Sequence, residues 1–76
     1  MKDLVKTMAQ ALVDNPEEVI VNEIIGEQTS IIELKVSEND RGKVIGRQGK
    51  TARAMRTILI AASNKQAKRV MLEIIE

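Results

Sequence analysis

The segment Gly46-Arg47-Gln48-Gly49 is the part of this sequence best suited to contact a charged ligand. Because glycine has no Cβ, the backbone at both ends of the segment can approach another backbone closely. A helix is expected to begin near Gly49, and the unpaired N–H groups of its first turn favour a phosphate. Lys50 and Arg53 add positive charge. The segment predicts a site for a sugar-phosphate backbone, unless the glycines only let two helices turn tightly.

Other chemistry is largely excluded by the residue inventory. The chain has no cysteine and no histidine, so thiolate or imidazole metal sites and Cys-His or Ser-His catalysis are ruled out. Gly49-Lys50-Thr51 resembles the end of a P-loop, but that loop needs a glycine where this chain has Val44. A lone carboxylate such as Glu38 or Asp40 more often caps a helix or pairs with a cation than acts as a base. We expect no enzymatic activity and no cofactor.

Charge is distributed unevenly along the 76 residues, although the net charge is only +1. Residues 1–40 carry three basic and nine acidic side chains, whereas residues 41–76 carry nine basic and two acidic ones. The two parts therefore have net charges of −6 and +7, and no acidic residue occurs from Arg41 to Arg69. Such asymmetry is expected of a surface that binds polyanions, although a solvated pair of helices would also explain it. Aromatic residues are absent, so bases have no aromatic ring on which to stack.

Apolar periodicity predicts the first three elements. Residues 2–13 are expected to form an amphipathic helix, because apolar side chains recur there every three or four positions, and Pro16 follows its end. Two β-branched runs, residues 19–25 and 29–36, predict a hairpin around Gly26. The second run has one face expected to be buried, formed by Ile32, Leu34 and Val36. Which face of the first run is buried stays open.

The second half is expected to hold two helices and a strand. Asp40 is expected to cap a short helix that reaches Ile45, with its side chain accepting hydrogen bonds from the first turn. A longer helix should run from Lys50 to about Ser63-Asn64. Its expected apolar face is formed by Met55, Ile58, Leu59 and Ala62. Residues 70–75 alternate as a final strand. The sequence thus predicts one α+β domain over residues 1–76, with helices on one face of a three-stranded sheet.

The stretch from Gly42 to Ala52 resembles the core signature of the KH domain, in which an aliphatic pair, here Val44-Ile45, precedes a GxxG loop. The element order, α-β-β-α-α-β, resembles the type II form of that fold. Over essentially its whole length the chain is similar to the small single-KH proteins of bacteria, the KhpA family. Ala52 departs from the KH pattern, which usually has a large aliphatic residue there, and this departure predicts a shallower base-binding pocket.

The resemblance implies that the chain binds single-stranded RNA, with the GxxG loop on the phosphates of about four nucleotides. The residues expected to contact RNA are Lys43, Val44, Ile45, Gly46, Arg47, Gln48, Gly49, Lys50 and Arg53. Val44 and Ile45, with Ile32 and Leu34, would line an aliphatic base groove between the two helices and the neighbouring strand, or simply pack in the core. With about four cations on phosphates, the logarithm of affinity should fall with that of salt at a slope of roughly −3.

The resemblance also implies a role as an RNA chaperone or post-transcriptional regulator that forms a homodimer and pairs with a larger KH-containing protein. Two alternatives remain, namely a protein interaction or dimerisation module with a purely structural glycine turn, and a ribosome-associated assembly factor. Ile60 is expected to be either a contact surface or a partly buried core position. No signal peptide or membrane-spanning stretch is recognisable, so we expect a cytoplasmic protein that does not enter a membrane.

Overall fold

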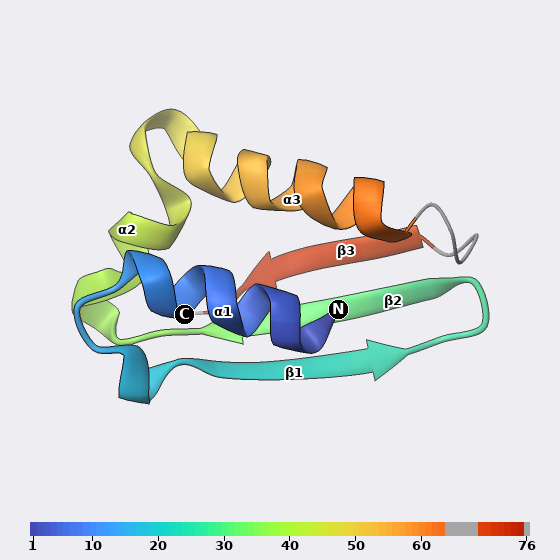
Figure 1. Ribbon diagram of the computed structural model, residues 1–76, viewed down its shortest axis with the longest axis horizontal. Helices are drawn as coiled ribbons and strands as arrows, with labels where there is room; N and C mark the ends of the chain where they lie inside the picture. Colours follow the sequence, from blue (N-terminus) through green and yellow to red (C-terminus); the bar gives the residue numbers. More distant parts are fainter. Residues whose placement is uncertain (64–68, 76) are drawn as a thin grey trace.

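The computed structural model describes residues 1–63 and 69–75. Its helices and strands are α1 (Lys2–Leu12), β1 (Ile20–Ile25), β2 (Thr29–Lys35), α2 (Arg41–Ile45), α3 (Lys50–Ser63) and β3 (Arg69–Ile74), as Figure 1 shows. Single 3₁₀ turns precede β1, α2 and α3, at Pro16–Glu18, Glu38–Asp40 and Arg47–Gly49. The order α-β-β-α-α-β confirms the predicted type II KH fold.

The sheet has β2 at its centre, antiparallel to β1 and parallel to β3. The hairpin places Ile24 opposite Ile31, and the parallel pair places Ser30 beside Val70. Two parallel neighbours need a long crossover connection, and here that connection contains α2, the glycine turn and α3. Figure 1 shows α1 lying across β1 and β2, and α3 running alongside β3. The expected site therefore lies in the segment that connects these two neighbouring strands.

The core lies between the sheet and the helices. The predicted buried face of β2 is confirmed, because Ile32, Leu34 and the following Val36 are all buried. On β1 the inward residue is Val21, whereas Ile20 and Ile24 lie on the exposed side of the sheet. These strand residues pack against buried side chains of the three helices, which are Val5, Ala9, Val44, Met55 and Leu59.

The buried face of α3 differs from the prediction. Met55 and Leu59 are buried as expected, but Ile58 is 46% exposed and Ala62 is also exposed. The remaining buried positions are the small residues Ala52 and Ser63. The buried stripe thus has a spacing of three, four and four residues, which is that of one helix face. The prediction was wrong at positions 58 and 62 because it followed side-chain type, while two small side chains form the buried stripe together with Met55 and Leu59.

The predicted end of α3 is confirmed at Ser63, and Asn64 lies outside the described residues. The final strand is also confirmed, with Leu72 buried and Met71 on the exposed side. No helix in the described part of the chain is long and apolar enough to cross a membrane.

Candidate nucleic-acid interface

The turn between α2 and α3 is formed by backbone angles that favour glycine. Gly46 has a φ of 77°, Gln48 of 58° and Gly49 of 74°, all in the left-handed region. The N–H of Gly49 donates to the carbonyl of Gly46 at 3.1 Å, and the N–H of Gly46 donates to the carbonyl of Gly42 at 2.8 Å. The first bond closes the turn, and the second caps the end of α2. The turn is thus closed by two hydrogen bonds between backbone groups.

The two glycines are required for different reasons. A Cβ at Gly46 would lie 2.8 Å from the backbone nitrogen of Thr51 and 2.7 Å from its Cβ, which is too close for real atoms. A Cβ at Gly49 would meet nothing within 4 Å. Gly46 therefore lets the turn pack closely against the start of α3, whereas Gly49 leaves an open side. That open side is where a second backbone can approach.

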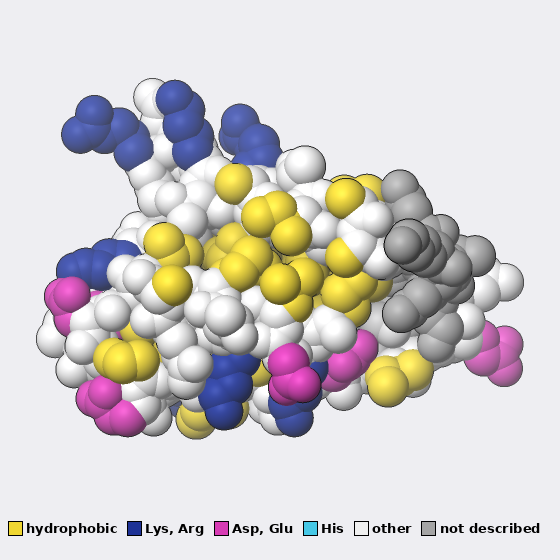
Figure 2. Space-filling model, viewed as in Figure 1, with side chains coloured by type: hydrophobic (Ala, Val, Ile, Leu, Met, Phe, Trp, Pro, Cys, Tyr) yellow, Lys and Arg dark blue, Asp and Glu magenta, His cyan; other side chains and the backbone are white. Residues whose placement is uncertain are grey.

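Three cations surround this turn. Arg47, Lys50 and Arg53 are exposed, and no carboxylate among residues 1–63 and 69–75 lies within ion-pair distance of them. Figure 2 shows Lys and Arg side chains projecting from the end of the molecule that carries the turn. Gln48 is exposed at the tip. The structure therefore brings five of the predicted site residues together, namely Gly46, Arg47, Gln48, Gly49 and Lys50, with Arg53 one turn along α3. Lys65 and Lys68, also in the basic segment, lie outside the described residues.

Lys43 is held differently from these three cations. Its Nζ lies 2.7 Å from Oδ2 of Asp14, in the loop that follows α1. The hydrogen bond and the charge of Asp14 raise the pKa of Lys43. Because its charge is already paired, Lys43 has less attraction left for a phosphate than the three exposed cations.

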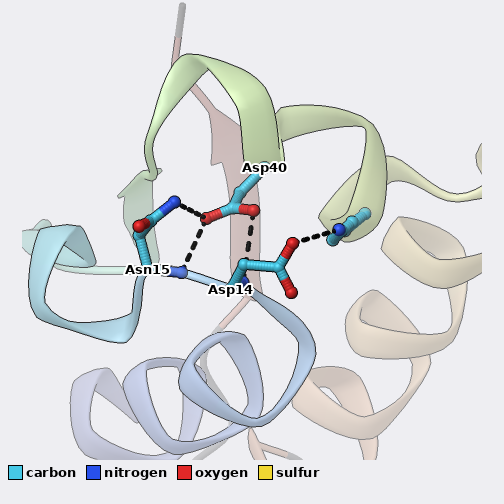
Figure 3. Close-up of polar contacts among 4 residues, drawn as sticks. Asp14, Asn15 and Asp40 are labelled. Atoms are coloured by element: carbon cyan, nitrogen blue, oxygen red, sulfur yellow. Dashed lines mark hydrogen bonds and ion pairs between the residues drawn. The ribbon is translucent and has the colours of Figure 1, made fainter.

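Asp40 does not cap α2 as predicted, because its side chain makes no hydrogen bond to the first turn of that helix. Instead the carboxylate accepts hydrogen bonds from the backbone N–H of Asp14 at 3.2 Å and from the backbone N–H of Asn15 at 3.0 Å. The side-chain amide of Asn15 donates a third bond at 3.1 Å, as Figure 3 shows. Burial opposes ionisation of Asp40, but these bonds outweigh it and lower its pKa. The carboxylate thus ties the loop after α1 to the start of α2.

The predicted aliphatic residues fall into two groups. Val44, Ile32 and Leu34 are each 0% exposed and pack in the core, so they have no surface to offer a base. Ile45, at the end of α2, is 37% exposed and can still contact a ligand beside the turn. Ile60 is 55% exposed, which fits the contact-surface alternative and not the partly buried one. Ala52 is buried against the core and adds nothing to a base pocket.

An apolar hollow of about 300 Å³ lies on a different side of α3, against α1. It is lined by Met8, Ala11, Leu12, Thr51, Ala54, Met55 and Ile58. Figure 2 shows the apolar side chains gathered over this part of the surface. Its lining contains none of the predicted RNA-contacting residues, so it is a separate surface.

Arg56 is an arginine beside the candidate site that the sequence analysis did not select. Its Nε and Nη2 donate to the backbone carbonyl of Leu72 at 3.4 and 3.3 Å, which links α3 to β3. The available signal was the repeat of Lys50, Arg53 and Arg56 at every third position. Neighbours at this spacing share one side of a helix. The cations therefore continue from the turn towards the strand.

Comparison with known proteins agrees with this geometry. A family model described as KhpA/KhpB, KH domain, matches residues 2–74. RNA-binding protein KhpA of Caldanaerobacter subterraneus subsp. tengcongensis is 61% identical over 99% of this chain and 100% of its own length. The protein of the same name from Clostridium perfringens is 56% identical over the same shares. That of Aquifex aeolicus is 55% identical over 100% of this chain and 96% of its own length.

No solved structure matches the chain. The family assignment therefore comes from sequence similarity, which spans the turn, both helices beside it and the complete sheet. These matches and the type II fold agree, and the chain belongs to the KhpA/KhpB family of KH domains.

Proposed function

We propose that this chain, acting as one KH domain over residues 1–76, binds single-stranded RNA by gripping its backbone with the turn Gly46–Gly49. The observation that carries the proposal is the open side of the turn at Gly49, where a Cβ would meet nothing, beside three exposed cations without a described carboxylate partner. A backbone that can be approached closely and positive charge around it are what a phosphate chain requires. The relatives' name, RNA-binding protein, supports the same ligand.

Within this proposal, Arg47, Lys50 and Arg53 contact phosphates, Gln48 donates hydrogen bonds at the tip and Ile45 packs against a base. Lys43 forms an ion pair with Asp14 at 2.7 Å, so it contributes to RNA binding only when this ion pair breaks and a phosphate takes the place of Asp14. The proposed role is that of a cytoplasmic RNA chaperone or post-transcriptional regulator that also pairs with a larger KH-containing protein.

The test is fluorescence anisotropy of a labelled single-stranded RNA titrated with the wild type and with the double variant Arg47→Asp, Gln48→Asp at two salt concentrations. Both side chains are exposed, and aspartate is among the residues that best tolerate the left-handed angles of Gln48. The variant should therefore fold, and its negative charges should abolish binding.

The matched control is Lys2→Asp, Thr7→Asp, which makes the same change in charge at two exposed positions of α1. It should retain nearly all of the affinity. Equal loss in both double variants would mean that only net charge matters and would refute the role of the turn.

A second candidate function is self-association. The apolar hollow between α1 and α3 supports it, because a second copy would remove this surface from water. Ile58, at 46% exposure, lies at its rim. Light scattering after gel filtration should give a dimer for the wild type and a monomer for Ile58→Glu. A wild type that stays monomeric at high concentration would exclude this function.

A further inference from the structure

Arg56 is anchored over the open edge of the sheet. The N–H of Arg69 donates to the carbonyl of Gln28, just before β2, at 2.9 Å, and the N–H of Ile75 donates to the carbonyl of Leu34 in β2 at 2.8 Å. In a parallel pair the residues of a strand alternate between the two edges, so Leu72 directs its N–H and carbonyl away from β2. The carbonyl that Arg56 contacts is therefore on the edge of β3 that no strand covers within residues 1–63 and 69–75.

Arg56 extends the row of cations on α3 that begins at Lys50, next to the glycine turn. Arg53 and Arg56 are neighbours on α3, and the helix begins at Lys50. Arg56 therefore lies roughly 9 Å along the helix axis from its start, at 1.5 Å per residue. A strand of about four nucleotides gripped at the turn can reach it.

The hydrogen bonds to Leu72 leave a defined part of the guanidinium available. Nε and the adjacent hydrogen of Nη2 are directed at the carbonyl oxygen, which occupies one side of the fork. The remaining end presents two parallel N–H donors, one from Nη1 and one from Nη2. No carboxylate in the described ranges pairs with it. An arginine whose fork is fixed in this way is suited to a partner with two adjacent acceptor atoms.

We propose that Arg56 recognises a base that offers two adjacent acceptors, which are O6 and N7 of guanine or O2 and N3 of cytosine. Adenine places a donor beside each ring acceptor on its pairing edges, and uracil has an N–H between its carbonyls, so neither matches the fork. Arg53 is exposed without a described backbone anchor and contacts phosphate instead. The inference rests on the proposed function and adds base selection to it.

The experiment compares the affinity of the wild type for four labelled single-stranded RNAs of equal length, which are U only, or U with one central C, G or A, so that none of the four pairs with itself. A bidentate contact discriminates by about tenfold. The wild type should bind the C-containing or the G-containing strand about tenfold more tightly than the U-only and A-containing strands, and the better of the two identifies the base.

Two variants separate base recognition from charge. Arg56→Lys retains the charge but has no fork, so it should lose the preference among the four RNAs while its salt dependence stays the same. Arg53→Gln should bind all four RNAs more weakly, with a shallower salt dependence and an unchanged preference. The preference is a ratio of two affinities of one protein, so any loss of folded protein in Arg56→Lys cancels.

The outcomes are distinguishable. Failure of the wild type to bind any of the four RNAs would refute the proposed function and this inference together. Binding without a preference, or a preference that persists in Arg56→Lys, would refute the inference alone and leave the backbone grip intact. A preference lost in Arg56→Lys and kept in Arg53→Gln would establish it.

Discussion

Asp40 accepts two hydrogen bonds from Asn15, one from its backbone N–H at 3.0 Å and one from its side-chain amide at 3.1 Å. The two residues are 25 positions apart, and the contact joins the loop after α1 to the start of α2. Since α2 leads directly into the glycine turn, the placement of the turn depends on this carboxylate.

Replacement of Asp40 by asparagine should destabilise the fold. One of the two carboxylate oxygens becomes an NH₂ group, which faces an N–H donor and leaves it unsatisfied in a buried place. Thermal unfolding followed by far-ultraviolet circular dichroism should show a fall in Tm of at least about 5 °C. Glu38→Gln, which makes the same chemical change at an exposed position two residues earlier, should have little effect. Equal Tm values for both variants would contradict this account.

The contribution of Asp40 should also depend on pH. Its pKa in the folded protein lies below the ordinary value of 3.8, because the hydrogen bonds from Asp14 and Asn15 outweigh the opposing effect of burial. A lowered pKa means that the stabilisation is complete above the ordinary value and is lost as the pH falls through the folded one. The difference in Tm between the wild type and Asp40→Asn should therefore be constant near neutral pH and should shrink below about pH 4. A difference that grows on acidification would show that the sign is wrong.

The two glycines should respond differently to alanine. Gly49→Ala should cost about 1–2 kcal/mol, the strain of a left-handed residue, because nothing obstructs its Cβ. Gly46→Ala should cost clearly more, since its φ of 77° and ψ of 171° lie in a region that essentially only glycine adopts, and its Cβ would also collide with Thr51. Chemical denaturation measures both. The double variant Gly46→Ala, Thr51→Ala should recover little stability, because the backbone nitrogen of Thr51 at 2.8 Å remains. Full recovery would mean that the side chain alone was in the way.

Salt dependence should report the pairing of Lys43. With three exposed cations on phosphates, the logarithm of affinity should fall with that of salt at a slope of about −2, and not the −3 expected with a fourth cation. Asp14→Asn frees Lys43 and should steepen the slope to about −3. Glu17→Gln makes the same change in net charge at an exposed position and serves as the control. Identical slopes for Asp14→Asn and the wild type would refute the competition between carboxylate and phosphate.

Local signals explain what could be predicted from the sequence. Helix and strand periods and the spacing of Gly46 and Gly49 depend on near neighbours, so the element order and the turn were predictable. The partners of Asp40 and Lys43 were not, because they lie 25 to 29 positions away in the chain. The capping preference of aspartate describes an isolated helix end. In this fold the carboxylate of Asp40 instead accepts hydrogen bonds from Asp14 and Asn15, in the loop after α1. The anchoring of Arg56 by Leu72 was equally hidden, since it depends on where β3 meets α3.

The crossover between β2 and β3 has a consequence for the order of events in folding. The pairing of Ser30 with Val70 encloses α2, the turn and α3 in one long loop, and closing it costs entropy before the sheet contacts form. α3 packs against β3, and α2 packs against α3, so the packing around the turn is complete only when β3 is in place. We therefore expect the turn and the global fold to form in one cooperative step, so that the hydrogen-bonded amide protons of Gly46 and Gly49 exchange through whole-molecule unfolding.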